Sequence, residues 1–341
     1  MNRFLLVMLF GCQEYNLQGP ESVVTTYNPP DLEVERKEDH ITQVTVPAVD
    51  VLFVVDNSGS MQEEQDNLRA NFEGFMRYFT DSGLDYHVGV VSTDMDNRNQ
   101  SGKLQLDDSG NDRYIDSSYD AATAVASFKQ RANLGIMGSS DERGKDAAYT
   151  ALTTEANSTN DGFYREEAVL SIVVISDEID YSRKISTQEF ISWENGLKPE
   201  DDQAWFSAIV GPKPRGCSSG SGNAEQGTGY LEVVDGVGGI DFSICESDYS
   251  SVLEELGMQA AGLKREFFLT EVPLEDTIKV SVTTDGDTQK FEGDKWTYDG
   301  VRNSVTFSSF VPEPLAVVNI SYTRLADASA PEAEVADTAA E

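Results

Sequence analysis

The sequence predicts an α/β protein with a doubly wound, mostly parallel sheet flanked by helices, followed by a small domain of the β-sandwich type. Apolar runs at residues 51–55 and 171–175 lack the polar alternation of a half-buried strand, so each is expected to be buried on both faces. Strand and helix signals alternate between residues 48 and 270, which favours a parallel sheet covered by helices. After residue 270, short alternating strands follow one another with turn signals between them.

The elements of the first domain follow from apolar patterning. Strands are expected where short apolar runs are rich in β-branched or aromatic residues, near 51–55, 86–92, 169–175 and 205–210. Helices are expected near 61–81, 142–157, 187–196 and 249–264. The first helix is the best marked, because one helical face carries Leu68, Phe72, Phe75, Met76 and Phe79.

The segment 94–133 is long, polar and poorly periodic, and we expect it to lie near the carboxyl edge of the sheet, where insertions could shape the choice of partner. Its run from Asp107 to Asp112 is faintly similar to a calcium-binding loop. Asp112 stands where an EF-hand needs Gly, and Ser118 stands where it needs a bidentate Glu. We therefore expect no calcium site there.

The chain divides into five parts. Residues 48–270 form the α/β domain and residues 271–325 the β domain, with strands near 277–282, 296–298, 303–307 and 316–322. Residues 326–341 hold acidic residues and many Ala but no basic residue, which predicts a disordered tail. Residues 12–47 are rich in Pro and polar residues and are expected to be a tether, with room for an edge strand around Ile41.

Residues 1–11 have the composition of a secretory signal: Arg3, a short apolar stretch, and Gly11 before Cys12. Leu9-Phe10-Gly11-Cys12 resembles a bacterial lipobox, which implies lipidation of Cys12. By the same resemblance, Gln13 favours the outer membrane. The chain is then an exported outer-membrane lipoprotein facing the periplasm or the cell surface. A plain signal peptide or a misplaced start codon are the alternatives.

Cysteine usage agrees with export. The chain has three Cys, and lipidation of Cys12 leaves the pair Cys217 and Cys245. An even pair in an oxidising compartment predicts a disulfide between them. Two buried free thiols are the alternative.

The most informative motif is Asp56-x-Ser58-x-Ser60, which follows the apolar run 51–55 and precedes the first helix. It offers one carboxylate and two hydroxyls at the carboxyl edge of the sheet, where open α/β sheets bind ligands. Such hard oxygen donors suit Mg²⁺, or Mn²⁺ or Ca²⁺, rather than zinc or copper. The alternative is an ordinary turn with a helix cap.

This motif resembles the metal-ion-dependent adhesion site (MIDAS) of von Willebrand factor type A (VWA) domains. The resemblance implies two further ligands. The first is a hydroxyl from the loop 135–144, for which Ser139 is the best match and Ser140 a rival. The second is Asp177, which ends the apolar run 171–175 and often acts through water in the family. Glu178 and Asp180 add negative potential but are not expected to be ligands, and we interpret Glu142 as a helix-start acid rather than a group supporting the site.

Charge and chemistry together indicate a partner. Neutral Ser58 and Ser60 leave a bound cation short of anionic ligands, so it would accept a carboxylate from outside. We therefore expect a cell-envelope adhesion module, not an enzyme, whose partner is a protein presenting an acidic group. The net charge of −35 argues against nucleic acid and against direct adsorption to anionic lipid, so membrane contact would come only through the lipid anchor.

Two other functions remain open at this point. In the first, the cation only braces the loop of a structural surface protein. In the second, the chain is a metal-dependent hydrolase or phosphatase, because strands ending in Asp are also typical of haloacid-dehalogenase phosphatases. Those enzymes use Asp-x-Asp, and here the second acid is replaced by Ser58. The chain has only His40 and His87, which makes a Ser-His-Asp site improbable.

Overall fold

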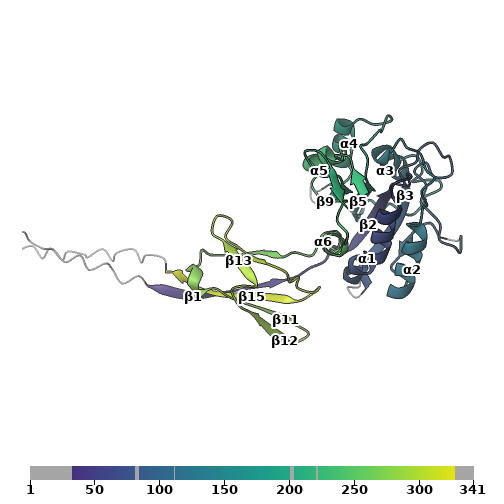
Figure 1. Cartoon of the computed structure of the whole chain (residues 1–341). Coiled ribbons are helices and arrows are strands. Elements are labelled where there is room, and N and C mark those ends of the chain that lie inside the picture. The colour runs from purple at the N-terminus through teal and green to yellow at the C-terminus, as the bar shows by residue number, and fades with distance from the viewer. Residues whose placement is uncertain (1–32, 81–83, 111, 200–202, 220–221, 327–341) are drawn as a thin grey trace, which may run out of the picture. The chain divides into compact units, whose positions relative to one another are not determined.

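The computed structural model describes residues 33–326 except 81–83, 111, 200–202 and 220–221. The predicted signal, Cys12 and nearly all of the acidic tail lie outside the described residues. Among those described, no helix combines the length and apolar character needed to cross a membrane. Figure 1 gives the order of the elements along the chain.

The α/β domain is built on a six-stranded sheet in the order β4-β3-β2-β5-β6-β9. Neighbouring strands are parallel except for the pair β3 and β4. The strands are β2 (Ala48–Val55), β3 (Asp85–Ser92), β4 (Ile115–Asp116), β5 (Val169–Ser176), β6 (Ala204–Val210) and β9 (Asp241–Ser243). The predicted doubly wound fold is thereby confirmed. The predicted strands correspond to β2, β3, β5 and β6, whereas the short edge strands β4 and β9 were not predicted.

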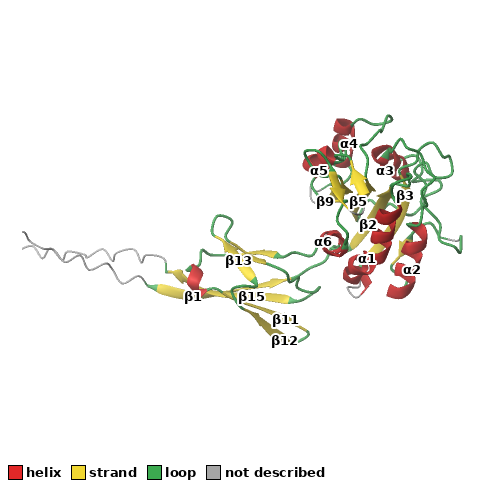
Figure 2. Cartoon of the chain, viewed as in Figure 1, coloured by secondary structure: helices red, strands yellow, loops and turns green. Residues whose placement is uncertain are grey.

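Helices cover both faces of this sheet (Figure 2). They are α1 (Gln62–Thr80), α2 (Ala121–Arg131), α3 (Gly144–Leu152), α4 (Thr187–Glu194), α5 (Leu231–Val237) and α6 (Ser250–Ala260). Phe53 and Val55 of β2 pack in one core with α1, α2 and α6, whereas Leu52 and Val54 pack in a second core with α3, α4 and α5. Successive residues of a strand point to opposite faces, so both kinds of position must be apolar here.

Helix α2 lies in the segment 94–133, for which the sequence analysis predicted no helix. Asp120 caps the helix by accepting a hydrogen bond from the Thr123 amide. Phe128 is fully buried, with its ring 5.0 Å from Phe53 and 3.3 Å from Phe72 between centroids. The helix places few apolar residues on its buried face, which is why its periodicity is weak in the sequence. Asp107, the first residue of the run that is faintly similar to a calcium-binding loop, accepts a hydrogen bond from Arg131 of this helix at 3.3 Å.

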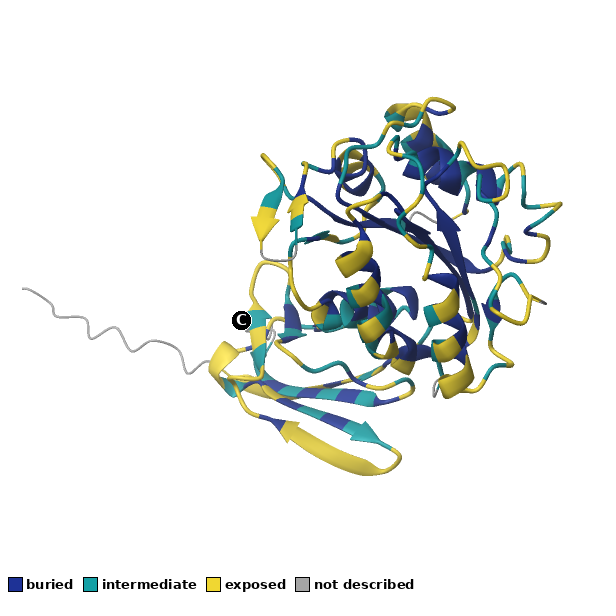
Figure 3. Ribbon diagram, turned by 45° about the vertical axis from the view of Figure 1, so that its right-hand side comes forward, coloured by how far each residue is buried: buried dark blue, intermediate teal, exposed yellow. Residues whose placement is uncertain are grey.

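Two further sheets form the predicted domain of the β-sandwich type. One sheet has the order β1-β15-β11-β12 and the other β10-β14-β13. The bounds are β1 (Val34–Thr42), β10 (Glu266–Phe268), β11 (Lys279–Thr284), β12 (Asp287–Phe291), β13 (Trp296–Asp299), β14 (Ser304–Phe307) and β15 (Val317–Leu325). Residues from both sheets, including Val280, Phe307 and Ile320, share one core. β15 alternates buried and intermediate positions, whereas β2 is buried throughout, and Figure 3 shows continuous burial along the central strands of the large sheet.

Two domain bounds therefore differ from those expected. Val34–Thr42 belong to the sandwich as β1, although we placed residues 12–47 in a tether. Glu266–Phe268 also belong to the sandwich, although we placed the boundary at residue 270. Each of these strands lies next to a partner that is distant in sequence, so local patterning did not reveal the pairing.

A buried carboxylate joins three parts of the sandwich. Asp39 of β1 accepts from the Thr270 amide at 2.9 Å and from the Tyr322 hydroxyl at 2.9 Å. Tyr322→Phe should therefore lower the free energy of unfolding by about 1 to 3 kcal/mol, because the buried carboxylate of Asp39 loses one of its donors. Urea unfolding would measure the change. The matched variant Tyr119→Phe removes a hydroxyl that bonds exposed Asp112 and should cost less than about 0.5 kcal/mol. Equal losses for the two variants would contradict the expectation.

Candidate metal centre at the carboxyl edge of the sheet

Asp56 and Asp177 come together because β2 and β5 are neighbours in the sheet. Val55 pairs with Ile175, and the Asp56 amide donates to the Ile175 carbonyl at 3.0 Å. The chain leaves β2 for β3 on one side, whereas β5 lies on the other side, so the two carboxyl ends meet at the switch point of the sheet. Crevices at this position are where open α/β sheets hold ligands.

The Asp56 side chain is fully buried and held by two donors. Its Oδ1 accepts from the Ser58 amide at 2.7 Å, and its Oδ2 accepts from the Ser176 hydroxyl at 2.7 Å. Helix α1 is tied to the same residue, because the Gln65 side chain donates to the Asp56 carbonyl at 2.9 Å. The carboxylate is therefore fixed in direction by the turn into α1 and by the neighbouring strand.

Four of the five predicted ligands lie near one another. The hydroxyls of Ser58 and Ser60 lie 3.3 Å apart, and Ser60 is close enough to Asp177 to favour the ionised form of its carboxyl, although burial raises the pKa of Asp177 on balance. The Asp177 carboxylate is buried, and its Oδ1 has no hydrogen-bonding partner in the described structure. A buried, unpartnered carboxylate oxygen is costly in water-free surroundings and would be satisfied by a cation.

Ser139, the fifth predicted ligand, makes its side-chain hydrogen bonds with residues outside the other four predicted ligands. Its hydroxyl donates to Asp96 Oδ2 at 3.0 Å and accepts from the Asp141 amide at 3.1 Å. The loop does approach the site, since the Gly138 amide donates to the Asn57 carbonyl at 2.8 Å. A Cβ at Gly138 would lie 2.2 Å from the Asn57 side chain, so only glycine permits this approach. The structure thus joins Ser139 to Asp96 rather than to Asp56.

Glu142 lies beside Asp56, which the sequence did not lead us to expect. It is fully buried, its Oε2 accepts from the Thr93 hydroxyl, and its carboxyl lies within hydrogen-bonding reach of Asp56. Helix α3 begins only at Gly144, so our interpretation of Glu142 as a helix-start acid was wrong. An acid before Arg-Gly has no local signature in the sequence, and only the approach of the loop to β2 reveals its role.

The crowding of acids raises their pKa values in the cation-free protein. The pKa of Glu142 is raised to about 9. Burial is the largest cause, and the negative charge of Asp56 is the next cause that raises it. Burial raises the pKa of Asp56 to about 6, with a further contribution from Asp177. Burial and these two aspartates also raise the pKa of Glu178 to about 7. The edge therefore retains protons near neutral pH, because too much negative charge gathers in too little water.

Glu64 of α1 extends the acidic edge. Its pKa is raised to about 7, mainly by burial. The negative charges of Asp177, Glu63 and Asp56 raise it further. Its Oε2 is buried and has no hydrogen-bonding partner in the described structure.

Asp180 has a structural role, in line with our expectation that it is not a ligand. It pairs with Lys145 of α3 at 3.1 Å, and both side chains are buried. Asp146 of the same helix accepts from the amides of Arg183, Lys184 and Ile185. These contacts hold the loop after β5 against α3 and keep Asp177 at the sheet edge.

The donor set fits a hard divalent cation. The oxygens that Asp56, Ser58, Ser60 and Asp177 offer are of the type preferred by Mg²⁺, Mn²⁺ and Ca²⁺. Among the described residues, no three or more His, Cys, Asp or Glu side chains are placed to hold one ion together. The predicted set contains only two carboxylates and draws its other donors from hydroxyls, so it is a different arrangement from such a cluster.

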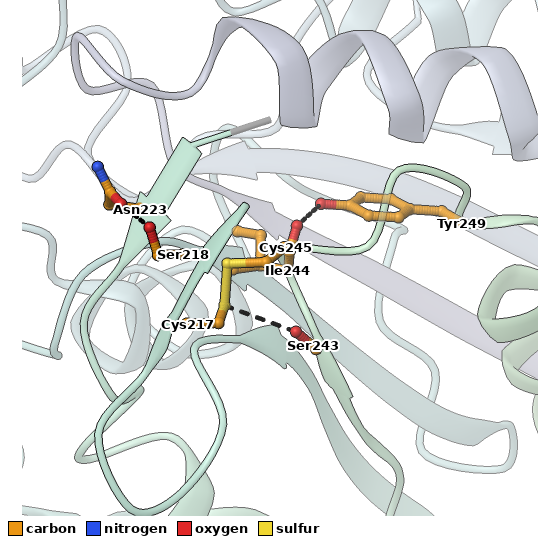
Figure 4. Close-up of a disulfide and its surroundings, with 7 residues drawn as sticks. All are labelled: Cys217, Ser218, Asn223, Ser243, Ile244, Cys245 and Tyr249. Carbon is orange, nitrogen blue, oxygen red and sulfur yellow. Dashed lines mark hydrogen bonds between the residues drawn. A yellow bond between two sulfur atoms is a disulfide. The ribbon is translucent and has the colours of Figure 1, made fainter. Parts of the chain in front are cut away.

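The predicted disulfide is confirmed. Cys217 in β7 (Cys217–Ser219) is bonded to Cys245, which follows β9 (Figure 4). β7 pairs with β8 (Gly222–Ala224), and the chain continues from β8 to Glu225. The Glu225 amide donates to the Asp177 carbonyl at 2.8 Å. The disulfide therefore lies close in sequence to a residue that contacts the metal centre.

Comparison with known proteins gave matches only among solved structures. No family model matches the chain, and no curated protein matches it. A von Willebrand factor type A protein from Catenulispora acidiphila is 10% identical, with 87% of this chain covered and a TM-score of 0.40. The pilus adhesin SpaC from Lactobacillus rhamnosus GG is 10% identical, with 87% covered and a TM-score of 0.45. Proximal thread matrix protein 1 from the mussel byssus is 14% identical, with 66% covered and a TM-score of 0.38.

The chain spans 66%, 42% and 48% of the length of these three structures. With TM-scores below 0.5, the likeness carries no functional conclusion. The α/β fold stands on the strand order and register described above.

Proposed function

We propose that this chain is a cation-dependent binding module of the VWA type, in which Asp56, Ser58, Ser60 and Asp177 hold Mg²⁺, Mn²⁺ or Ca²⁺. The observation that supports this most directly is that Asp56 and Asp177 follow neighbouring strands at the switch point of the sheet, with the hydroxyls of Ser58 and Ser60 beside them. The unpartnered Oδ1 of Asp177 and the raised pKa values of its neighbours supply the electrostatic reason. A cation would relieve the repulsion among these carboxylates.

Each residue has a distinct part in this proposal. Asp56 supplies the fixed anionic donor, because Ser58 and Ser176 already orient its two oxygens. Ser58 and Ser60 supply neutral donors, so the cation keeps positive charge for an acidic group of a protein partner. Glu142 lies beside Asp56 and is protonated at neutral pH without a cation, so its carboxyl would add negative charge there only after cation binding displaces that proton. Bound there, the cation supplies a positive centre for a carboxylate.

A hydrolase is the weaker alternative. His87 bonds the Phe163 carbonyl at 2.8 Å and lies on β3 opposite Asp50 of β2, near the amino ends of these strands. His40 is on β1, where it bonds Asn319 at 2.6 Å. Neither imidazole contacts the carboxyl edge that carries Asp56, so the general base of a Ser-His-Asp site has no candidate among the described residues. We therefore propose a non-enzymatic role.

The proposed place of action is the cell envelope. The lipobox-like sequence ending at Cys12 supports an outer-membrane lipoprotein, and the Cys217–Cys245 disulfide agrees with an oxidising compartment. The partner would then be a protein in the periplasm or at the cell surface that presents a carboxylate.

Cation uptake should be coupled to proton release. Asp56, Glu178 and Glu142 have raised pKa values, so they hold protons at pH 6 that a cation must displace. Affinity for Mn²⁺ should therefore rise between pH 6 and pH 8, by up to about tenfold per pH unit for each proton released. Isothermal calorimetry in two buffers of different ionisation enthalpy would count those protons.

Calcium and magnesium titrations under the same conditions would show which cation binds most tightly. An absence of binding heat at both pH values, with cation up to about 1 mM, would refute the proposed metal centre.

A further inference from the structure

We propose that the Cys217–Cys245 disulfide positions Asp177 and thereby sets the cation affinity of the metal centre. The inference rests on the proposed function, because it concerns the same site. The disulfide is linked to the Asp177 loop through residues 211–217 and 224–228, which we call the brace. The brace follows β6, carries Cys217 at the end of its first stretch, and contacts the loop that contains Asp177.

The brace holds the Asp177 loop at two points. The Glu225 amide donates to the Asp177 carbonyl at 2.8 Å, and the Asp180 amide donates to the Thr228 carbonyl at 3.0 Å. These bonds lie on either side of the turn from Asp177 to Asp180. They fix the backbone from which the Asp177 side chain projects, and they leave its carboxylate oxygens available.

The two stretches of the brace lie backbone against backbone. The Gly227 amide donates to the Gly211 carbonyl at 2.9 Å, and Gly211 also bridges Gln226. A Cβ at Gly211 would lie 1.8 Å from the Glu225 carbonyl oxygen, and one at Gly216 would lie 2.0 Å from the Ala224 carbonyl oxygen. Any displacement of residues 211–217 is therefore transmitted directly to Glu225.

The disulfide anchors this arrangement to the core (Figure 4). Ile244, next to Cys245, is buried; its amide donates to the Val210 carbonyl at 3.1 Å, and its carbonyl accepts from the Tyr249 hydroxyl at 2.8 Å. Tyr249 itself is fully buried. Cys245 therefore sits on a fixed point, whereas Cys217 sits on a two-stranded hairpin with three residues in each strand. A hairpin of this size is marginally stable by itself.

Removing the bridge should loosen the brace and weaken cation binding. Loss of a group that orients a metal ligand costs at least about tenfold in affinity, so we expect the Mn²⁺ dissociation constant of Cys217→Ser/Cys245→Ser to rise about tenfold. Hydrogen exchange of the Glu225 and Asp180 amides should become faster in the same variant. The amide of Asp56, which bonds to β5, should keep its protection.

The test is Mn²⁺ calorimetry on the wild-type chain, the double Ser variant and two single variants. Gly216→Ala keeps both cysteines but forces the brace apart, and it should raise the dissociation constant to a similar extent. Lys213→Ala removes an exposed ion pair with Asp235 from the same stretch and should leave the dissociation constant unchanged.

The outcomes separate the two proposals. An unchanged Mn²⁺ dissociation constant in a folded double Ser variant would overturn this inference while leaving the metal centre intact. If the double variant does not fold, Gly216→Ala decides, and a wild-type dissociation constant there would overturn the inference. Failure of the wild-type chain to bind Mn²⁺ would instead refute the proposed function and this inference with it.

Discussion

Asp56→Ala is expected to lower the affinity for Mn²⁺ and Mg²⁺ by at least about 100-fold and to abolish capture of an acidic partner. Asp56 is the only proposed ligand whose two carboxylate oxygens are both oriented by protein donors, Ser58 and Ser176. Removing it takes away the anionic donor around which the hydroxyls of Ser58 and Ser60 are arranged. Calorimetry would measure cation uptake. A pull-down with and without chelator would measure capture.

The cation-free variant should nevertheless stay folded. Burial raises the pKa of Asp56 from 3.8 to about 6, so ionising this carboxyl costs more free energy in the folded chain than in the unfolded chain. A carboxyl whose pKa is higher in the folded chain lowers the free energy of unfolding once the pH exceeds its pKa in the unfolded chain. Replacing Asp56 therefore removes a destabilising contribution above about pH 4. The lost hydrogen bonds offset part of that gain. The melting temperature without cation should therefore change little.

A matched control lies at the same edge. Asp141 is exposed and pairs with Arg183, and Asp141→Ala should leave cation affinity within about threefold of the wild type. If Asp56→Ala still binds cation with wild-type affinity, the metal centre lies elsewhere. If the variant loses the cation but captures partner normally, the cation only braces the loop, and the structural alternative is correct.

Glu194→Gln is expected to stabilise the protein at alkaline pH and to have much less effect at acidic pH. Glu194 ends helix α4, is fully buried, and neither of its carboxylate oxygens has a hydrogen-bonding partner in the described structure. Burial raises its pKa from 4.5 to about 8. The folded chain therefore keeps this carboxyl protonated at neutral pH, whereas the unfolded chain releases the proton.

The sign of the pH effect follows from this difference. A carboxyl with a raised folded pKa costs nothing below about pH 4.5, costs more as the pH rises, and reaches its full penalty above about pH 8. The full penalty is of the order of 3 to 5 kcal/mol. The Gln variant does not ionise, so the difference in unfolding free energy between variant and wild type should grow by that order from pH 4.5 to pH 8. The buried amide of the variant also lacks hydrogen-bonding partners, which lowers the free energy of unfolding of the variant by the same amount at every pH.

Urea unfolding at a series of pH values would test this expectation. Glu166→Gln is the control, because Glu166 is exposed, and its difference from the wild type should not depend on pH. A pH-independent difference for Glu194→Gln would mean that the buried carboxyl has found a partner or that water reaches it. Glu194 lies on α4, outside the set of acids at the metal centre, so the result does not depend on cation binding.

The predictions that succeeded came from local patterns with a strong physical cause. An unbroken apolar run is needed where a strand is covered on both faces, which identified β2 and β5 and the order of layers around them. Acids that directly follow two such strands must lie at one edge if the strands are neighbours. Asp56 and Asp177 could therefore be paired from the sequence.

The predictions that failed concerned segments whose position depends on distant contacts. Ser139 was chosen by its place in a loop, yet the loop turns it to Asp96, and Gly138 against Asn57 determines that path. Helix α2 was missed because its burial rests on Phe128 against Phe72 of another helix. β1 was assigned to a tether because its partner β15 is far along the chain.

The sequence by itself determined the doubly wound sheet, the sandwich, the disulfide pair and the carboxyl edge that carries Asp56, because hydrophobic periodicity and strand ends are local properties. Only the tertiary structure decided that Glu142 lies beside Asp56, that Asp180 pairs with Lys145, and that the brace holds Asp177. These choices rest on hydrogen bonds and charge pairs between loops distant in sequence. Their geometry is set when the packed strands and helices bring the loops together.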